Sequence, residues 1–123
     1  GSELDPRNGQ PVVMTRMELL SIALNTGNAS NLEKMSKGEG WPAESILRVL
    51  DREMKKEDWD FVQGVWDSLE LLWPHIAASE RRLSGVVPER VEVLPISTKF
   101  GEYRGGYYPG VYDPSRASAP RWI

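Results

Sequence analysis

The side chains that most often carry out catalysis are scarce in this chain. It contains a single histidine, His75, and no cysteine, which excludes a thiol nucleophile and a thiolate metal site. His75 follows Pro74 within a segment that we expect to be helical. A metal site would need several ligands that converge on one point. We therefore interpret His75 as a structural or surface residue.

Three acids lie close together in the sequence: Glu57, Asp58 and Asp60. Paired carboxylates could act as a general acid and base. These acids lie where a helix is expected to begin, however, and negative charge is favourable at helix N-termini. Capping therefore explains them more simply than catalysis. Because no loop has the spacing of a calcium-binding loop either, the sequence predicts no catalytic residue, metal site or cofactor, and we expect that the protein is not an enzyme.

The most distinctive stretch is "GGYYPGVYDP", residues 105–114. It lacks the Gly-x-Gly-x-x-Gly order of a dinucleotide-binding turn and the Gly-Lys-Ser/Thr of a phosphate-binding loop. We interpret it as an arm that packs or docks, with Arg104, Tyr107, Tyr108 and Tyr112 as candidate binding residues. Ordering such a stretch costs conformational entropy that buried rings must offset. We therefore predict that at least two of the three tyrosines pack on the rest of the protein.

Two other patterns each have two interpretations. Trp59, Trp66 and Trp73 are seven residues apart, so a helix places them on one side, where they form either core or a groove lined with rings; we favour core. Asparagines recur at steps of three in "ALNTGNASN", at positions 25, 28 and 31. They could cap helices or hold the backbone of the C-terminal arm, and we favour caps.

Residues 14–85 contain the sequence patterns that begin and end helices. Thr15 and Glu18 form a capping box for a helix over residues 16–25, and a second helix should begin near Asn28 or Ser30 and end at Gly38. Pro42 suits the first turn of a third helix. The fourth is expected to begin at a cap on Asp58, to be kinked or divided by Pro74, and to end at Gly85.

The character of the chain changes after residue 85. Prolines recur and no helical period survives, although residues 91–93 alternate like a strand, and residues 107–108 and 111–112 could form short extended pieces. We predict a mainly α fold: compact antiparallel helices with an extended, mostly irregular C-terminal arm that leaves room for short β-strands. The 123 residues suit one domain, divided into a tag scar and linker (1–13), a helical body (14–85) and an aromatic arm packed on that body (86–123).

Composition excludes several classes of protein. The net charge is −3, so no global basic field attracts nucleic acid or anionic lipid. No apolar run approaches the roughly 20 residues that span a bilayer, and we expect no membrane partner. The absence of cysteine fits a reducing compartment. The chain begins Gly1-Ser2 without methionine, as after removal of a tag. We expect a piece of a longer protein rather than a complete small protein, because residues 3–13 resemble a linker.

The succession "ALNTGNASN", "EDWDFVQGVWD", "LWPHI", "SGVVPERVEVLP" and "GEYRGGYYPGVYDP" resembles a segment of the polyvalent proteins, very large multidomain proteins of phages and prophages. The resemblance covers residues 15–114. It implies an associated domain of unknown role beside DNA-modifying or protease-type domains, in a protein that works in the cytoplasm of the infected bacterium or is carried in the virion. It implies no catalytic residues.

Two functions of different class follow. The first is a non-enzymatic interaction or scaffolding module whose partners are neighbouring domains of its parent chain or another protein. The alternative is a nucleic-acid-associated module that combines stacking tyrosines with a basic groove. The cations that would line this groove are Arg81, Arg82, Arg90, Lys99 and Arg104. Glu89, Glu92 and Glu102 lie among them, so the excess of positive charge is slight and we favour the first function.

Overall fold

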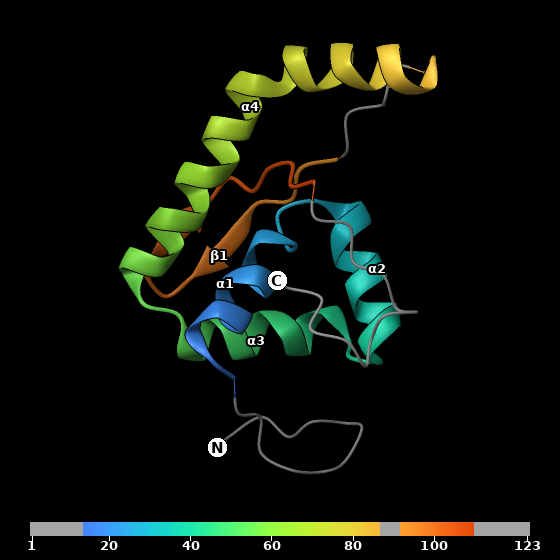
Figure 1. Ribbon diagram of the computed structural model, residues 1–123. Helices are drawn as coiled ribbons and strands as arrows, with labels where there is room; N and C mark the ends of the chain where they lie inside the picture. Colours follow the sequence, from blue (N-terminus) through green and yellow to red (C-terminus); the bar gives the residue numbers. More distant parts are fainter. Residues whose placement is uncertain (1–13, 87–91, 110–123) are drawn as a thin grey trace.

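The computed structural model describes residues 14–86 and 92–109 (Figure 1). In these residues the chain forms helices α1 (Arg16–Leu24), α2 (Ala29–Glu39), α3 (Ala43–Glu53) and α4 (Lys56–Ser84), followed by strands β1 (Ile96–Thr98) and β2 (Gly101–Tyr103). The expected mainly α fold with short strands near the C-terminus is therefore confirmed. The expected linker over residues 1–13, and the extended piece expected at residues 111–112, lie outside the described residues.

Local capping explains where the helices begin and end. The Thr15 hydroxyl accepts a hydrogen bond from the Glu18 backbone N–H at 3.2 Å, and the Glu18 carboxylate accepts one from the Thr15 N–H at 3.3 Å, so the predicted capping box is present. Asn28 caps α2, and Gly85 ends α4 with a φ of 77°. Glycine adopts this left-handed conformation without the steric cost that a Cβ would impose.

Two predicted helix ends are wrong. α2 continues past Gly38 and ends at Gly40, which has the positive φ of 73° that a left-handed cap requires. Asp58 lies in the third position of α4, and the cap residue is Lys55. The Asp58 carboxylate reaches back to accept the Lys55 N–H at 2.8 Å, so this acid still satisfies a free donor at the helix start.

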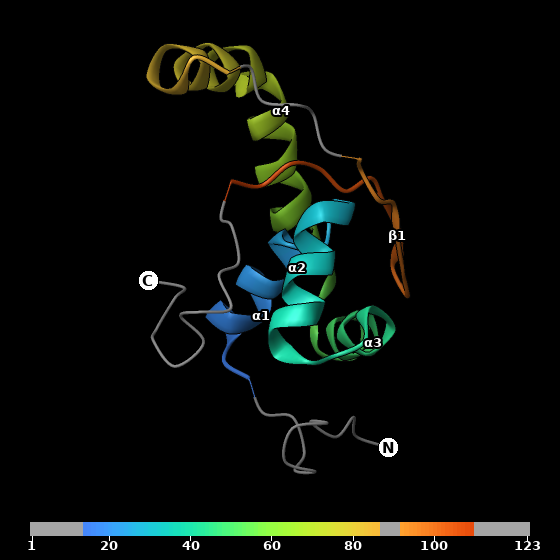
Figure 2. The same ribbon diagram turned by 90° about the vertical axis from the view of Figure 1, so that its right-hand side faces the viewer.

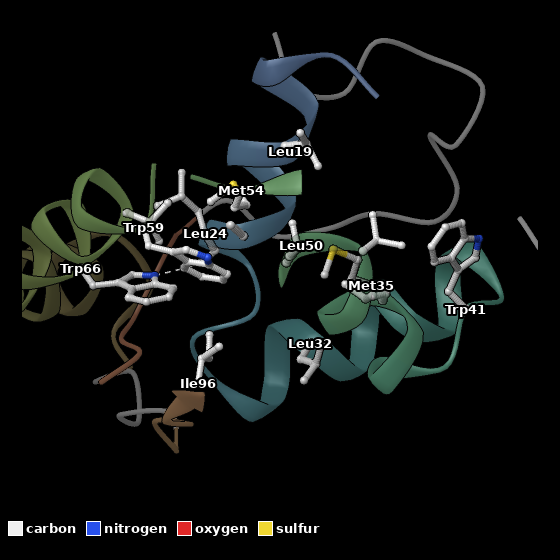
Figure 3. Close-up of a cluster of buried hydrophobic side chains, with 14 residues drawn as sticks. Leu19, Leu24, Leu32, Met35, Trp41, Leu50, Met54, Trp59, Trp66 and Ile96 are labelled. Atoms are coloured by element: carbon white, nitrogen blue, oxygen red, sulfur yellow. Dashed lines mark hydrogen bonds between the residues drawn. The ribbon is translucent and has the colours of Figure 1, made fainter. Parts of the chain in front are cut away.

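Helices α1, α3 and α4 pack around an apolar core, with α2 packed on α3. Figure 3 shows the centre of this core, where Trp59 and Trp66 lie near Leu24 and Met54. Both indoles are 1% exposed, which confirms core for two of the three evenly spaced tryptophans. Trp73 is half-buried. The third tryptophan of the series is therefore not one of the fully buried core residues.

Helix α4 contains Pro74 and is sharply bent, as predicted, but it is not divided. Proline removes one helical hydrogen bond and crowds the carbonyl four residues earlier, which explains the bend. Figures 1 and 2 show that the part of α4 after the bend, drawn in yellow, stands clear of the other helices. None of the helices in residues 14–86 is long and apolar enough to cross a membrane.

Strands β1 and β2 form an antiparallel hairpin in which Ile96 pairs with Tyr103 and Thr98 with Gly101. The strand expected over residues 91–93 is not formed: Val93 makes only an isolated bridge with Asn28, and residue 91 lies outside the described ranges. Tyr107 and Tyr108 are irregular rather than extended strand. The backbone groups next to Val93 instead form hydrogen bonds with the loop between α1 and α2. This loop contains no strand along which a β-ladder could continue.

Candidate functional site

The C-terminal arm docks on the loop between α1 and α2. The Gly27 carbonyl accepts two backbone hydrogen bonds, from Leu94 N at 3.0 Å and from Gly106 N at 2.9 Å. The Ala29 N–H donates to the Glu92 carbonyl at 2.9 Å. Two separate parts of the arm, before and after the β-hairpin, are thus held by one short loop.

Three buried asparagines complete this attachment. Asn28 donates from its side-chain amide to the Gly106 carbonyl at 3.2 Å, while its side-chain oxygen accepts from Asn31 N at 2.9 Å. The Asn31 amide donates to the Tyr108 carbonyl at 3.0 Å and to the Asn25 side-chain oxygen at 3.1 Å. Both interpretations of these asparagines therefore hold: Asn28 caps α2 and also holds the arm.

Glycines 27 and 106 lie against the Trp66 ring. A Cβ on Gly27 would lie 2.5 Å from this indole and a Cβ on Gly106 would lie 2.6 Å from the tryptophan's own Cβ, so neither position has room for a side chain. The indole N–H donates to the Leu24 carbonyl at 3.1 Å (Figure 3). Gly106 of "RGGYY" thus serves close packing, and this part of the stretch packs as predicted.

The tyrosines of the arm contact the helical body. The Tyr107 ring lies 5.1 Å from the Trp73 ring, edge to face, and burial raises the pKa of its phenol. Tyr108 is half-buried against the core, and Tyr112 lies outside the described residues. The prediction that at least two tyrosines pack on the body is confirmed by Tyr107 and Tyr108.

Arg104 is engaged within the protein. Its guanidinium donates to both carboxylate oxygens of Asp67, at 2.8 and 2.9 Å, and its backbone N–H donates to Gln63 at 2.8 Å. The hydrogen bond from Arg104 holds the pKa of Asp67 below its usual value. Of the candidate binding residues, Arg104 and Tyr107 contact α4 and Tyr108 is held by Asn31 of α2, and their described contacts are internal.

Just before Arg104, Tyr103 extends the same attachment toward the start of α4. Its hydroxyl donates to Asp60 at 2.7 Å and its ring stacks on Trp59 at 5.7 Å. Burial, followed by the hydrogen bond to Asp60, raises the pKa of Tyr103 to about 12. Asp60, Gln63 and Asp67 are spaced at three and four residues, so one face of α4 holds the end of the hairpin and the residue that follows it.

The acids at the start of α4 have structural partners. Asp58 pairs with Arg16 and caps the helix, and Asp60 pairs with Lys56 at 2.8 Å. Within the described ranges no group of three or more histidines or acids could hold a metal ion. His75 is exposed on α4 directly after the bend-forming proline.

Those cations of the nucleic-acid alternative that the structure describes do not form one basic surface. Arg81 and Arg82 lie in the last turn of α4. Lys99 lies in the turn of the hairpin, with its ammonium 5.4 Å from the centre of the Phe100 ring. Figures 1 and 2 place the end of α4 and the hairpin in separate parts of the molecule, and Arg90 lies outside the described residues.

Several apolar side chains on α4 are exposed, and the spacing of the tryptophans did not predict this. Leu71 is 81% exposed, Leu72 50% and Leu83 83%, and nearer the start of the helix Phe61 is 56% exposed. Just beyond the helix, Val86 is also exposed. The four that belong to α4 lie on faces of the helix away from the stripe at 59, 66 and 73, and this spacing could have identified them in the sequence.

The chain matches no protein-family model, no curated protein and no solved structure. Its function is therefore inferred from its own residues and contacts.

Proposed function

We propose that this chain is a non-enzymatic interaction or scaffolding module, and that the part of α4 after the bend is its contact element. The observation that carries this proposal is the exposure of Leu83, on a helical segment that stands clear of the other helices, and of Val86, just beyond the end of that helix. Exposed apolar side chains grouped on one element mark contact sites more often than isolated ones do. Arg81 and Arg82 beside them supply a polar margin.

The docked arm supports a scaffolding role, because it braces α4 next to its bend. Tyr107 packs on Trp73, the residue immediately before Pro74, and Arg104 fixes the preceding turn through Asp67. Such contacts fix the direction of the segment that follows and reduce the entropy lost when it binds. The arm therefore holds the contact element in place.

The resemblance to modules of polyvalent phage proteins supports a partner that is a neighbouring domain of the same chain or another protein delivered with it. In that setting the protein works in the cytoplasm of the infected bacterium. The nucleic-acid alternative has less support, because Arg104 is paired with Asp67 and the remaining described cations are dispersed over separate elements.

Amide hydrogen exchange tests the proposed contact element. We compare this chain alone with the same chain extended by its natural neighbouring sequences, and follow the amides of residues 75–85. We expect exchange in this segment to slow at least about tenfold in the extended protein, and Leu83→Glu to abolish that protection. Amides of α2 serve as the internal control and should be unchanged. Equal exchange of residues 75–85 in both proteins would contradict the proposal.

A further inference from the structure

The outer face of α4 carries a second exposed surface, on the straight part of the helix before Pro74. Phe61, Gly64, Ser68 and Leu71 are all exposed, and their steps of three and four residues place them on one face. Figure 1 shows this part of α4 along one side of the molecule, with no other described element outside it. We call these four residues the outer face.

Among residues 14–86 and 92–109, no contact accounts for a glycine at position 64. It lies in the interior of α4 without a positive φ, and a Cβ built on it would meet nothing within 4 Å. Gly27 and Gly106, in contrast, are required by the Trp66 ring. A glycine inside a helix is unfavourable compared with alanine. What Gly64 does offer is a place where another backbone can approach closely.

The outer face is symmetric about position 66. Phe61 lies five residues before this position and Leu71 five after it, while Gly64 lies two before and Ser68 two after. A second α4 running antiparallel, with a two-fold axis at position 66, would therefore place Phe61 opposite the partner's Leu71 and Gly64 opposite the partner's Ser68. Each contact then occurs twice, as two-fold symmetry requires of an isologous interface.

We propose that two copies of this chain associate through this antiparallel contact of α4 with α4. The large apolar side chains meet at the two ends of the contact, and the small residues meet at its centre, where they allow the helices to approach. The opposed helix dipoles also favour the antiparallel direction. The inference uses a different surface from the part of α4 after the bend, and rests on the proposed function only in treating the chain as an interaction module.

The charges beside the outer face permit this association. Asp60 and Asp67 border it, and each already has a counterion: Lys56 at 2.8 Å and Arg104 at 2.8 Å, respectively. Neither of these two acids therefore brings an uncompensated charge to the contact. Because the contact spans only about three helical turns, it lies at the small end of interface sizes, and we expect a dissociation constant of about 10–100 μM.

Sedimentation velocity at concentrations of about 10 to 500 μM tests the association. We expect a monomer–dimer equilibrium that Phe61→Glu or Leu71→Glu shifts to monomer throughout this range. Met17→Glu, a matched change at an exposed apolar residue on α1, should leave the dimer intact. The double variant Phe61→Glu/Leu71→Lys should restore it, because each glutamate then faces a lysine of the other copy. Far-UV circular dichroism verifies that each variant is folded.

Cross-linking tests the direction of the contact. Because the chain has no natural cysteine, only the introduced cysteines can form disulfides. We mix the single variants Phe61→Cys and Leu71→Cys and oxidise them. The antiparallel pairing predicts disulfides between positions 61 and 71, and little product from either variant alone. Cross-links within each variant alone would overturn the antiparallel contact, and a chain that stays monomeric across the whole range would overturn the association.

The two proposals can fail separately. Leu83→Glu should leave the dimer intact while it abolishes the exchange protection expected in the extended protein. Phe61→Glu should abolish the dimer and preserve that protection. A dimer lost through Leu83→Glu and unaffected by Phe61→Glu would overturn the contact proposed for the outer face.

Discussion

At the scale of single residues, the side chain of Asn28 performs two tasks with its two polar atoms. Its oxygen caps α2 and its amide nitrogen holds the arm at Gly106, although the side chain is fully buried. A capping asparagine can often be replaced by aspartate or serine at little cost. A buried donor whose acceptor would otherwise be unsatisfied cannot.

Asn28→Asp separates these two tasks. The carboxylate keeps the acceptor for the Asn31 N–H but presents no donor to the Gly106 carbonyl. We expect the free energy of unfolding to fall by about 1–3 kcal/mol at neutral pH, measured by urea denaturation. A variant as stable as the natural protein at neutral pH would show that Asn28 acts only as a cap.

Of these two tasks, only capping has a local sequence pattern from which it could be predicted. A capping asparagine lies three residues from its partner, and the pattern of "NTGNASN" reveals it directly. The carbonyl that Asn28 holds belongs to a residue 78 positions later, and no local pattern indicates a contact at that separation. The same holds for Asp67, whose partner Arg104 is 37 positions away.

At the scale of elements, the arm behaves as part of the fold rather than as an appendage. Its Gly106 fits against Trp66, its backbone is held by the loop at Gly27, and Tyr107 and Tyr108 pack on the body. Ordering the backbone costs about 1–2 kcal/mol per residue. The ring contacts and hydrogen bonds of residues 105–108 must offset that cost.

Truncation after Arg104 tests the contribution of the arm to stability. The shortened chain loses every contact made by residues 105–109, so we expect the thermal unfolding midpoint to fall by about 5–10 °C. Truncation after Pro109 keeps all of those contacts and provides the matched control. Scanning calorimetry measures both. Equal midpoints for the two truncated chains would mean that residues 105–109 contribute nothing to stability.

The helices were predictable and the hairpin was not, for a physical reason. Helix boundaries depend on neighbours in sequence, such as Thr15 with Glu18 and the left-handed Gly85, so local chemistry identifies them. Residues 91–93 alternate as a strand does, yet Val93 has only Asn28 as a bridge partner. The ladder instead forms at residues 96–103, where the chain can turn back on itself.

At the scale of the whole molecule, charge is distributed in local pairs. Lys56 is paired with Asp60, Lys37 with Glu33 and Arg104 with Asp67. The total over the chain is −3. Pairs of this kind on a surface leave little net field at a distance. An interaction driven by apolar contacts on α4 fits this distribution better than one driven by long-range attraction to phosphates.

This distribution predicts weak binding to nucleic acid. Affinity for DNA rises with the number of phosphates neutralised by free lysine and arginine, and here Arg104 is already neutralised by Asp67. The β-hairpin, whose turn carries Lys99, and the end of α4, which carries Arg81 and Arg82, lie in separate parts of the fold (Figures 1 and 2). We expect dissociation constants no tighter than the non-specific range of about 10⁻⁴–10⁻⁶ M at physiological salt, for single- and double-stranded DNA alike. Fluorescence anisotropy of labelled oligonucleotides measures this. Submicromolar binding with a steep salt dependence, lost in the double variant Arg81→Ala/Arg82→Ala, would instead make the end of α4 a nucleic-acid contact and reverse the choice between the two functions.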